Sequence, residues 1–131
     1  RFEDASRCIF TKGLGTLPLP IRHGEGKIFT LDAALLEQLE EAGCVAARYV
    51  DAAGNPTDAF PDNPNGSLHA IAGLSDPTGR IFGMMPHPEA YLFPENHPQW
   101  DVQKRANSLP EEGLGLMLFR NAVEAMNEVM A

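Results

Sequence analysis

The chain has 131 residues, of which 44% are hydrophobic and 21% are charged, and this balance is ordinary for one folded domain with an apolar core. Its formal net charge of −8 argues against nucleic acid and anionic membrane as partners, because both are recognised by clustered Lys and Arg. No apolar run approaches the length of a membrane span.

The N-terminal part of the chain predicts two strands. The first covers residues 1–12, is centred on Cys8-Ile9-Phe10, and ends at the glycines of residues 13–15. The second covers residues 17–22. Its two prolines, Pro18 and Pro20, restrict it to the edge of a sheet or to a bulge, since proline cannot donate to a strand ladder.

A helix is predicted over residues 32–42, with Gly43 as its natural stop. Apolar and acidic side chains fall on different faces of this helix, with Leu35, Leu36 and Leu39 on one face and Glu37, Glu40 and Glu41 mostly opposite. A strand over residues 45–50 follows, because the segment is rich in Val, Ala and Tyr.

Residues 51–67 predict a long loop, because Gly, Pro and Asn recur throughout the segment. Loops of this length without secondary structure usually carry function or are disordered. Two strands over residues 68–74 and 80–85 come next, joined by a hairpin-like turn at residues 75–79.

The C-terminal part predicts a loop rich in proline and aromatic residues over 91–100, a polar stretch over 101–108, and a final helix over 110–130. Pro110 suits the first turn of that helix. The apolar stripe of the helix is expected to pack on the core and comprises Phe119, Ala122, Val123, Met126 and Met130. About five short strands and two main helices together predict an α/β fold.

The segment with the clearest chemical content is Gly83-Met84-Met85-Pro86-His87-Pro88-Glu89. Residues i and i+2 of an extended chain point to the same side, so His87 and Glu89 are presented together at the end of a strand. Pro86 and Pro88 fix φ on both flanks. A carboxylate that accepts from one imidazole nitrogen leaves the other free as a base. Taken alone, the same motif is also compatible with a surface turn that has no function.

Three further motifs accompany this segment, namely Pro20-Ile21-Arg22-His23-Gly24-Glu25-Gly26, Asn63-Pro64-Asn65-Gly66-Ser67 and Ile71-Ala72-Gly73-Leu74. With these four motifs in this order, the chain resembles the glutaminase component of phosphoribosylformylglycinamidine synthase, a class I (triad-type) glutamine amidotransferase of purine biosynthesis. The resemblance covers essentially the whole chain. It implies an amidotransferase-like (flavodoxin-like) domain with a mixed sheet of about five strands and two main helices.

The resemblance also implies a chemistry, the hydrolysis of glutamine to supply ammonia to a synthetase subunit or domain of the same pathway. In the family, a cysteine attacks the glutamine amide, a histidine activates the cysteine and a glutamate orients the histidine. Matched by position, His87 would be the general base and Glu89 its orienter. No metal or organic cofactor is expected, and the location would be cytoplasmic. The alternative is a non-catalytic relative that keeps the fold and binds a synthetase partner.

Neither cysteine of the chain fits the position of the nucleophile. The family places it on a sharp strand-to-helix turn between small residues, whereas Cys44 lies at a helix-to-strand junction and Cys8 lies within a predicted strand. We interpret both as structural, reduced thiols. The resemblance therefore implies that residues 1–131 are the C-terminal portion of one amidotransferase domain, that the nucleophile lies upstream, and that the fragment alone is inactive. A strand edge left uncovered could then support a homo-oligomer.

Two loops are further candidates for the pocket or the partner surface. The His23 and Glu25 loop follows the second predicted strand, and it is either a loop near the active centre or a turn in which the glycines serve geometry alone. Asn63, Asn65 and Ser67 are interpreted as turn-forming residues, with a role in shaping a pocket or a partner surface as the alternative.

Two other histidines are interpreted more simply. His69 is predicted to be a hydrogen-bonded residue of a strand. His97 and Trp100 belong either to a loop packed over the core or to a docking edge, where an exposed tryptophan can serve as an anchor.

Overall fold

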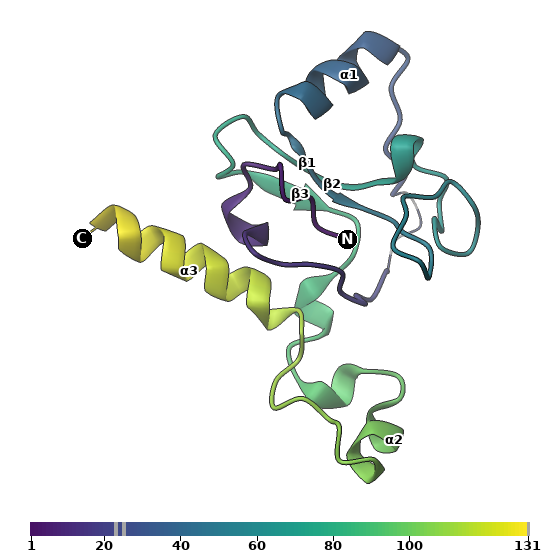
Figure 1. The fold of residues 1–131 in the computed structure, drawn as a ribbon, viewed down its shortest axis with the longest axis vertical. Coiled ribbons are helices and arrows are strands. Elements are labelled where there is room, and N and C mark those ends of the chain that lie inside the picture. The colour runs from purple at the N-terminus through teal and green to yellow at the C-terminus, as the bar shows by residue number, and fades with distance from the viewer. Residues whose placement is uncertain (23, 25, 131) are drawn as a thin grey trace.

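The computed structural model describes residues 1–22, 24 and 26–130, and shows an α/β structure built on an antiparallel sheet (Figure 1). The sheet has three strands in the order β1 (Val45–Arg48), β2 (Ile71–Ser75) and β3 (Phe82–Met84). Three α-helices are described, α1 (Ala33–Glu41), α2 (Trp100–Arg105) and α3 (Leu116–Met130). Short 3-10 helices cover Ile9–Thr11, Leu68–Ala70, Pro88–Ala90 and Pro94–Asn96. Within the described ranges, no helix combines the length and the apolar character that crossing a membrane requires.

The predicted hairpin at the centre of the chain is confirmed. β2 and β3 pair antiparallel, with Gly73 opposite Met84 and Ser75 opposite Phe82. The turn between them is closed by the carboxylate of Asp76. It accepts hydrogen bonds from the backbone N–H groups of Thr78, Arg80 and Ile81 and from the Thr78 hydroxyl. An aspartate that satisfies the turn in this way explains why the reversal occurs at this point.

The prediction of strands over residues 1–12 and 17–22 is wrong, because neither segment forms a strand. The expected mixed sheet of about five strands is therefore not confirmed. Each segment contributes only one isolated bridge, Phe2 to Ala47 and Ile21 to Pro86. The first segment is interrupted by a turn in which the Ser6 N–H donates to the Glu3 carbonyl, and then by the 3-10 helix at Ile9–Thr11. The second contains two prolines, which remove the donors that a continuous ladder needs.

The predicted helix and the strand after it are confirmed as α1 and β1. The Asp32 side chain caps the helix by accepting from the Ala34 N–H at 2.9 Å. The helix ends where Gly43 takes a φ of 67°, a left-handed conformation that glycine adopts without a steric penalty.

The core lies on both faces of the sheet. On one face, Leu36 of α1 packs with Val45 and Ile71. On the other face, the largest buried cluster joins the N-terminal segment to the sheet and to the start of α3, and comprises Phe2, Leu14, Ala47, Tyr49, Ala70, Ala72 and Leu118. Val45 and Ala47 belong to different faces although they are two residues apart. A bulge between them explains the change, because it shifts the alternation by one residue.

The C-terminal region differs from the prediction in two ways. A short helix that was not predicted, α2, begins at the end of the predicted loop and covers most of the polar stretch, and α3 begins at Leu116 rather than near Pro110. The predicted burial of the apolar stripe is also wrong, since the described side chains of Phe119, Val123 and Met126 are 43%, 60% and 53% exposed. The helix touches the molecule mainly through its first turns and projects away from the sheet (Figure 1).

Candidate active site

His87 lies just beyond β3, where the chain is held against the segment 20–22. The His87 N–H donates to the Pro20 carbonyl at 2.7 Å, and Ile21 forms an antiparallel bridge with Pro86. The chain then turns into the 3-10 helix Pro88–Ala90, for which His87 is the residue before the first turn. The backbone of the histidine is therefore tied to a distant segment, and its position does not depend on its own strand alone.

His87 and Glu89 face each other as predicted, although Glu89 lies in the 3-10 helix Pro88–Ala90 and not in the extended chain on which that prediction rested. The His87 Nδ1 and the Glu89 Oε1 are 2.6 Å apart. The hydrogen bond to His87 lowers the pKa of the Glu89 carboxyl below its usual value, and the positive charge of Arg22 acts in the same direction. When Nδ1–H donates to this carboxylate, Nε2 of the neutral ring is left as an acceptor that can take a proton.

The pair is open to solvent, since the side chain of His87 is 35% exposed and that of Glu89 is 57% exposed. The backbone next to it is nevertheless tightly held. The Gly115 N–H donates to the Tyr91 carbonyl at 3.0 Å, and a Cβ at Gly115 would lie 2.0 Å from the Pro88 carbonyl oxygen. Only glycine fits at this contact, so the start of α3 supports the segment that carries the pair.

Two cavities in the described part of the chain lie on either side of the 86–90 segment. The larger cavity, of about 460 Å³, is lined by Phe2, Tyr49 and Pro86 among others. The smaller cavity, of about 320 Å³, lies between residues 18–22 and 90–98. Pro18 and Leu19 line both, so a thin wall of chain separates them. His87 and Glu89 themselves are not among the lining residues of either cavity, which are contributed on this segment by Pro86 and Ala90.

The loop formed by residues 63–67 is a hydrogen-bonded structure. The carboxamide of Asn63 donates to the Ser67 carbonyl at 3.0 Å and accepts from the Ser67 N–H at 3.1 Å, and both residues are buried. Asn65 donates to the Gly26 carbonyl at 2.6 Å, and the Ser67 hydroxyl accepts from the Ile28 N–H at 3.0 Å. The turn-forming role predicted for this loop therefore extends to anchoring the chain that follows the segment 20–22.

Sequence comparisons place these features in a known family. The CobB/CobQ-like glutamine amidotransferase domain matches residues 1–125. The chain belongs to this amidotransferase family. It is similar to phosphoribosylformylglycinamidine synthase subunit PurQ of Methanococcus maripaludis, with 41% identity over 133 residues that cover 96% of this chain and 48% of that protein.

Two further relatives extend this similarity. The PurQ subunit of Dehalococcoides mccartyi is 40% identical over 124 residues, covering 95% of this chain and 45% of that protein. Phosphoribosylformylglycinamidine synthase of Saccharomyces cerevisiae is 41% identical over 123 residues, covering 92% of this chain and 9% of that protein. The amidotransferase chain thus spans about half the length of the PurQ relatives that it matches.

Neither cysteine of this amidotransferase chain lies in a reactive setting. Cys8 and Cys44 are both free thiols and both are 2% exposed. Burial raises the pKa of the Cys8 thiol, which disfavours the nucleophilic thiolate. Cys44 sits between α1 and β1, where its N–H donates to the Leu39 carbonyl and its carbonyl accepts from the Ser75 N–H. Their surroundings agree with the structural role that the sequence predicts.

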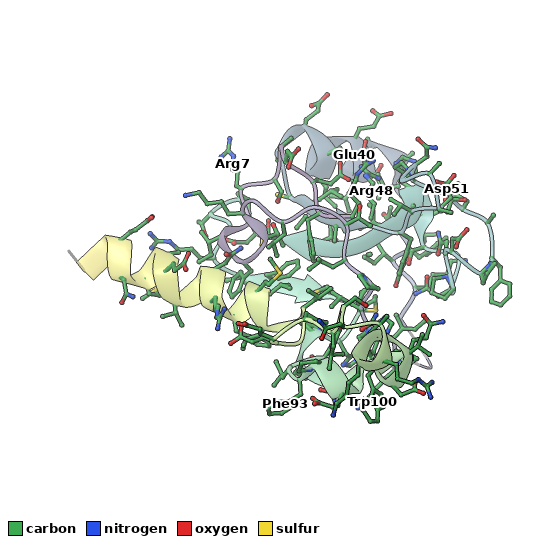
Figure 2. All side chains as sticks on the ribbon, turned by 60° about the horizontal axis from the view of Figure 1, so that its bottom comes forward. Arg7, Glu40, Arg48, Asp51, Phe93 and Trp100 are labelled. Carbon is green, nitrogen blue, oxygen red and sulfur yellow. The ribbon has the colours of Figure 1, made fainter. Side chains whose placement is uncertain are left out.

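The other histidines and the glutamate that the sequence singled out are His23, Glu25 and His69. His23 and Glu25 lie outside the described residues, and their role stays a prediction. His69 was wrongly predicted to lie in a strand, because it sits in the 3-10 helix before β2 with a φ of 51°. It is hydrogen-bonded as predicted, with its Nδ1 3.0 Å from the Glu40 Oε1, and Glu40 also pairs with Arg48 at 2.8 Å (Figure 2).

The region after residues 83–89 contains residues that no sequence motif connected with the candidate site. The ring of His97 lies 5.8 Å from that of Tyr91, and both residues line the smaller cavity together with Arg22. Trp100 opens α2 and is 37% exposed, on the same outer edge as Phe93 (Figure 2). Arg22 stood within a recognised motif, but nothing local indicated that its charge would act on Glu89.

Proposed function

We propose that this chain carries the histidine and the carboxylate of a glutaminase that supplies ammonia to phosphoribosylformylglycinamidine synthase in purine biosynthesis. The observation that carries the proposal is the 2.6 Å contact between His87 Nδ1 and Glu89 Oε1 in a member of the amidotransferase family. The names of the most similar relatives support the pathway.

In the proposed reaction, His87 is the general base and Glu89 holds its ring in one tautomer. His87 Nε2 takes the proton from a cysteine thiol, and the sulfur attacks the side-chain amide carbon of glutamine. The proton passes from His87 to the departing nitrogen, which leaves as ammonia, and an enzyme thioester remains. Water, deprotonated by the same ring, then hydrolyses the thioester to glutamate and restores the thiol.

The cysteine that His87 serves is proposed to lie outside these 131 residues. The support for this is that Cys8 and Cys44 are buried, and that neither stands on a strand-to-helix turn between small residues. We infer that the chain is the C-terminal portion of a single flavodoxin-like amidotransferase domain. We further propose that a synthetase subunit or domain of the same pathway receives the ammonia.

The experiment measures the release of glutamate and ammonia from glutamine. The 131-residue chain alone should release none, whereas a longer protein that joins it to the nucleophile-bearing segment should be active. In that longer protein, His87→Asn should lower kcat by ~10²–10⁴, the usual contribution of a general base. Glu89→Gln should lower it less, because an amide oxygen can still accept from the Nδ1–H.

A second histidine–carboxylate pair provides the matched control. His69 contacts Glu40 at 3.0 Å but lies in the 3-10 helix Leu68–Ala70 before β2, outside the segment that carries His87, so His69→Asn should leave glutamine turnover unchanged. Full activity in His87→Asn would refute the assignment. A longer protein that binds the synthetase but never hydrolyses glutamine would favour the alternative, a non-catalytic module. The buried state of both cysteines is the observation that keeps this alternative in view.

A further inference from the structure

The 63–67 loop contains an asparagine followed directly by a glycine, Asn65-Gly66. Gly66 has a φ of 67°, a left-handed conformation that glycine adopts without a steric penalty, so the turn itself favours glycine at this position. Glycine after asparagine also has a chemical consequence. It has no Cβ to shield its backbone nitrogen, which reaches the side-chain carbon of the asparagine and starts deamidation more readily than the nitrogen of a larger residue.

Deamidation at this dipeptide needs no reactant other than water. The backbone nitrogen of Gly66 loses its proton to solvent and bonds to Cγ of Asn65. The Cγ–Nδ2 bond then breaks, and Nδ2 takes a proton from water and leaves as ammonia. Water opens the resulting cyclic imide at either carbonyl, which gives aspartate, or isoaspartate in which the main chain runs through the former side chain. Either product adds a negative charge to the loop.

The structure holds the carboxamide of Asn65 at both ends. Its Nδ2 donates to the Gly26 carbonyl at 2.6 Å. Its Oδ1 accepts from the Ser67 N–H at 3.1 Å and from the Ser67 hydroxyl at 2.9 Å. Ring closure turns the carboxamide toward the Gly66 nitrogen and releases Nδ2, so these contacts must break first. Three hydrogen bonds of ordinary strength correspond to a rate lowered by ~10²-fold.

The product does not fit the closed loop as the asparagine does. A carboxylate carries acceptors only, so it cannot donate to the Gly26 carbonyl and is repelled by that oxygen. Lys27 stands beside the loop, with its Nζ 3.8 Å from the place that a Cβ at Gly66 would occupy. Its ammonium attracts a new carboxylate away from Gly26. The contact that ties the loop to residue 26 is therefore lost once the amide has been converted.

We propose that Asn65-Gly66 is a deamidation site that the closed 63–67 loop protects, and that its conversion permanently loosens the attachment of the loop to Gly26. Opening of the loop sets the rate of the reaction. The loss of the donor at position 65 makes the opening irreversible.

The first measurement follows deamidation of the 131-residue chain at neutral pH by peptide mapping and mass spectrometry, in buffer and in denaturing urea. Asn65 should react ~10²-fold more slowly in buffer than in urea, because only the folded loop holds its carboxamide. Asn107, an exposed asparagine before Ser108, is the internal reference and should change much less. Equal rates for Asn65 in the two conditions would overturn the proposed protection. This comparison needs no substitution, so it decides the point whether or not a variant folds.

The second measurement uses variants. Asn63→Ala removes two hydrogen bonds that close the loop without touching Asn65, so it should speed deamidation of Asn65 in buffer about ten-fold or more. Asn55→Ala is the control and should leave that rate unchanged, because Asn55 lies in a separate exposed turn. Asn65→Asp reproduces one product and should unfold at a lower urea concentration than the wild type. An unchanged midpoint would show that conversion does not loosen the loop.

Discussion

The side chain of Asn63 offers a sharp test of how the 63–67 loop is held. Asn63→Ala removes two hydrogen bonds, one from its Nδ2 to the Ser67 carbonyl and one from the Ser67 N–H to its Oδ1. Both Ser67 groups keep a second partner, because the carbonyl also accepts from the Ala70 N–H and the N–H also donates to Asn65. The substitution therefore weakens the loop without leaving a backbone group wholly unpaired.

The expected cost follows from these contacts. Each hydrogen bond contributes about 1 kcal/mol net to the free energy of unfolding. Asn63 is only 2% exposed, so removing its carboxamide also leaves a small void, which adds a smaller cost. We expect the free energy of unfolding to fall by roughly 2–3 kcal/mol. Urea denaturation measures this directly, as a lower midpoint with an unchanged m-value.

A second asparagine serves as the matched control. Asn55 lies in an exposed turn, so Asn55→Ala should change the free energy of unfolding by less than ~0.5 kcal/mol. If Asn63→Ala lost less than about 1 kcal/mol, or no more than Asn55→Ala, the two hydrogen bonds would not be the main support of this loop.

Two further predictions concern the backbone near the site and the turn between β2 and β3. Gly115→Ala should lower the free energy of unfolding by about 1–3 kcal/mol, because the new Cβ would lie 2.0 Å from the Pro88 carbonyl oxygen. Gly83→Ala is the control and should not destabilise the protein, because a Cβ at Gly83 has no neighbouring atom within 4 Å. Equal urea midpoints for the two variants would contradict this prediction. Hydrogen bonds from the Thr78 hydroxyl and from backbone N–H groups lower the pKa of Asp76 to about 2. The ionised carboxylate should therefore stabilise the turn fully above about pH 4, and this stabilisation should be lost as the pH falls toward 2. Thr78→Val should raise the titration midpoint of Asp76 followed by NMR, and an unchanged midpoint would show that the hydroxyl is not the main cause.

Several features of the fold could be predicted because they depend on neighbours in the chain. α1 was predictable because Asp32 caps its first turn and Gly43 ends it. The β2–β3 hairpin was predictable because its turn residues supply their own hydrogen bonds. The contact between His87 and Glu89 was also predicted, but for an extended segment, whereas Glu89 lies in the 3-10 helix Pro88–Ala90. The two side chains still meet because only one proline, with a fixed φ, separates them.

The errors arose where a segment needs a partner from elsewhere. Residues 1–12 and 17–22 have strand-like composition, but a strand forms only where a neighbour offers a continuous ladder, and here each segment finds a single bridge. The stripe of α3 has the right periodicity for burial, yet periodicity says which residues share a face and not what covers that face. Val123 of that stripe is 60% exposed.

By itself, therefore, the sequence determined the local elements and the histidine–carboxylate pair, because bond geometry, caps and spacing act within a few residues. Only the tertiary structure decided that Pro20 accepts the His87 N–H and that Arg22 and His97 line the same cavity. Those groups are far apart along the chain, and the packing of distant segments, which no local pattern records, brings them to one place.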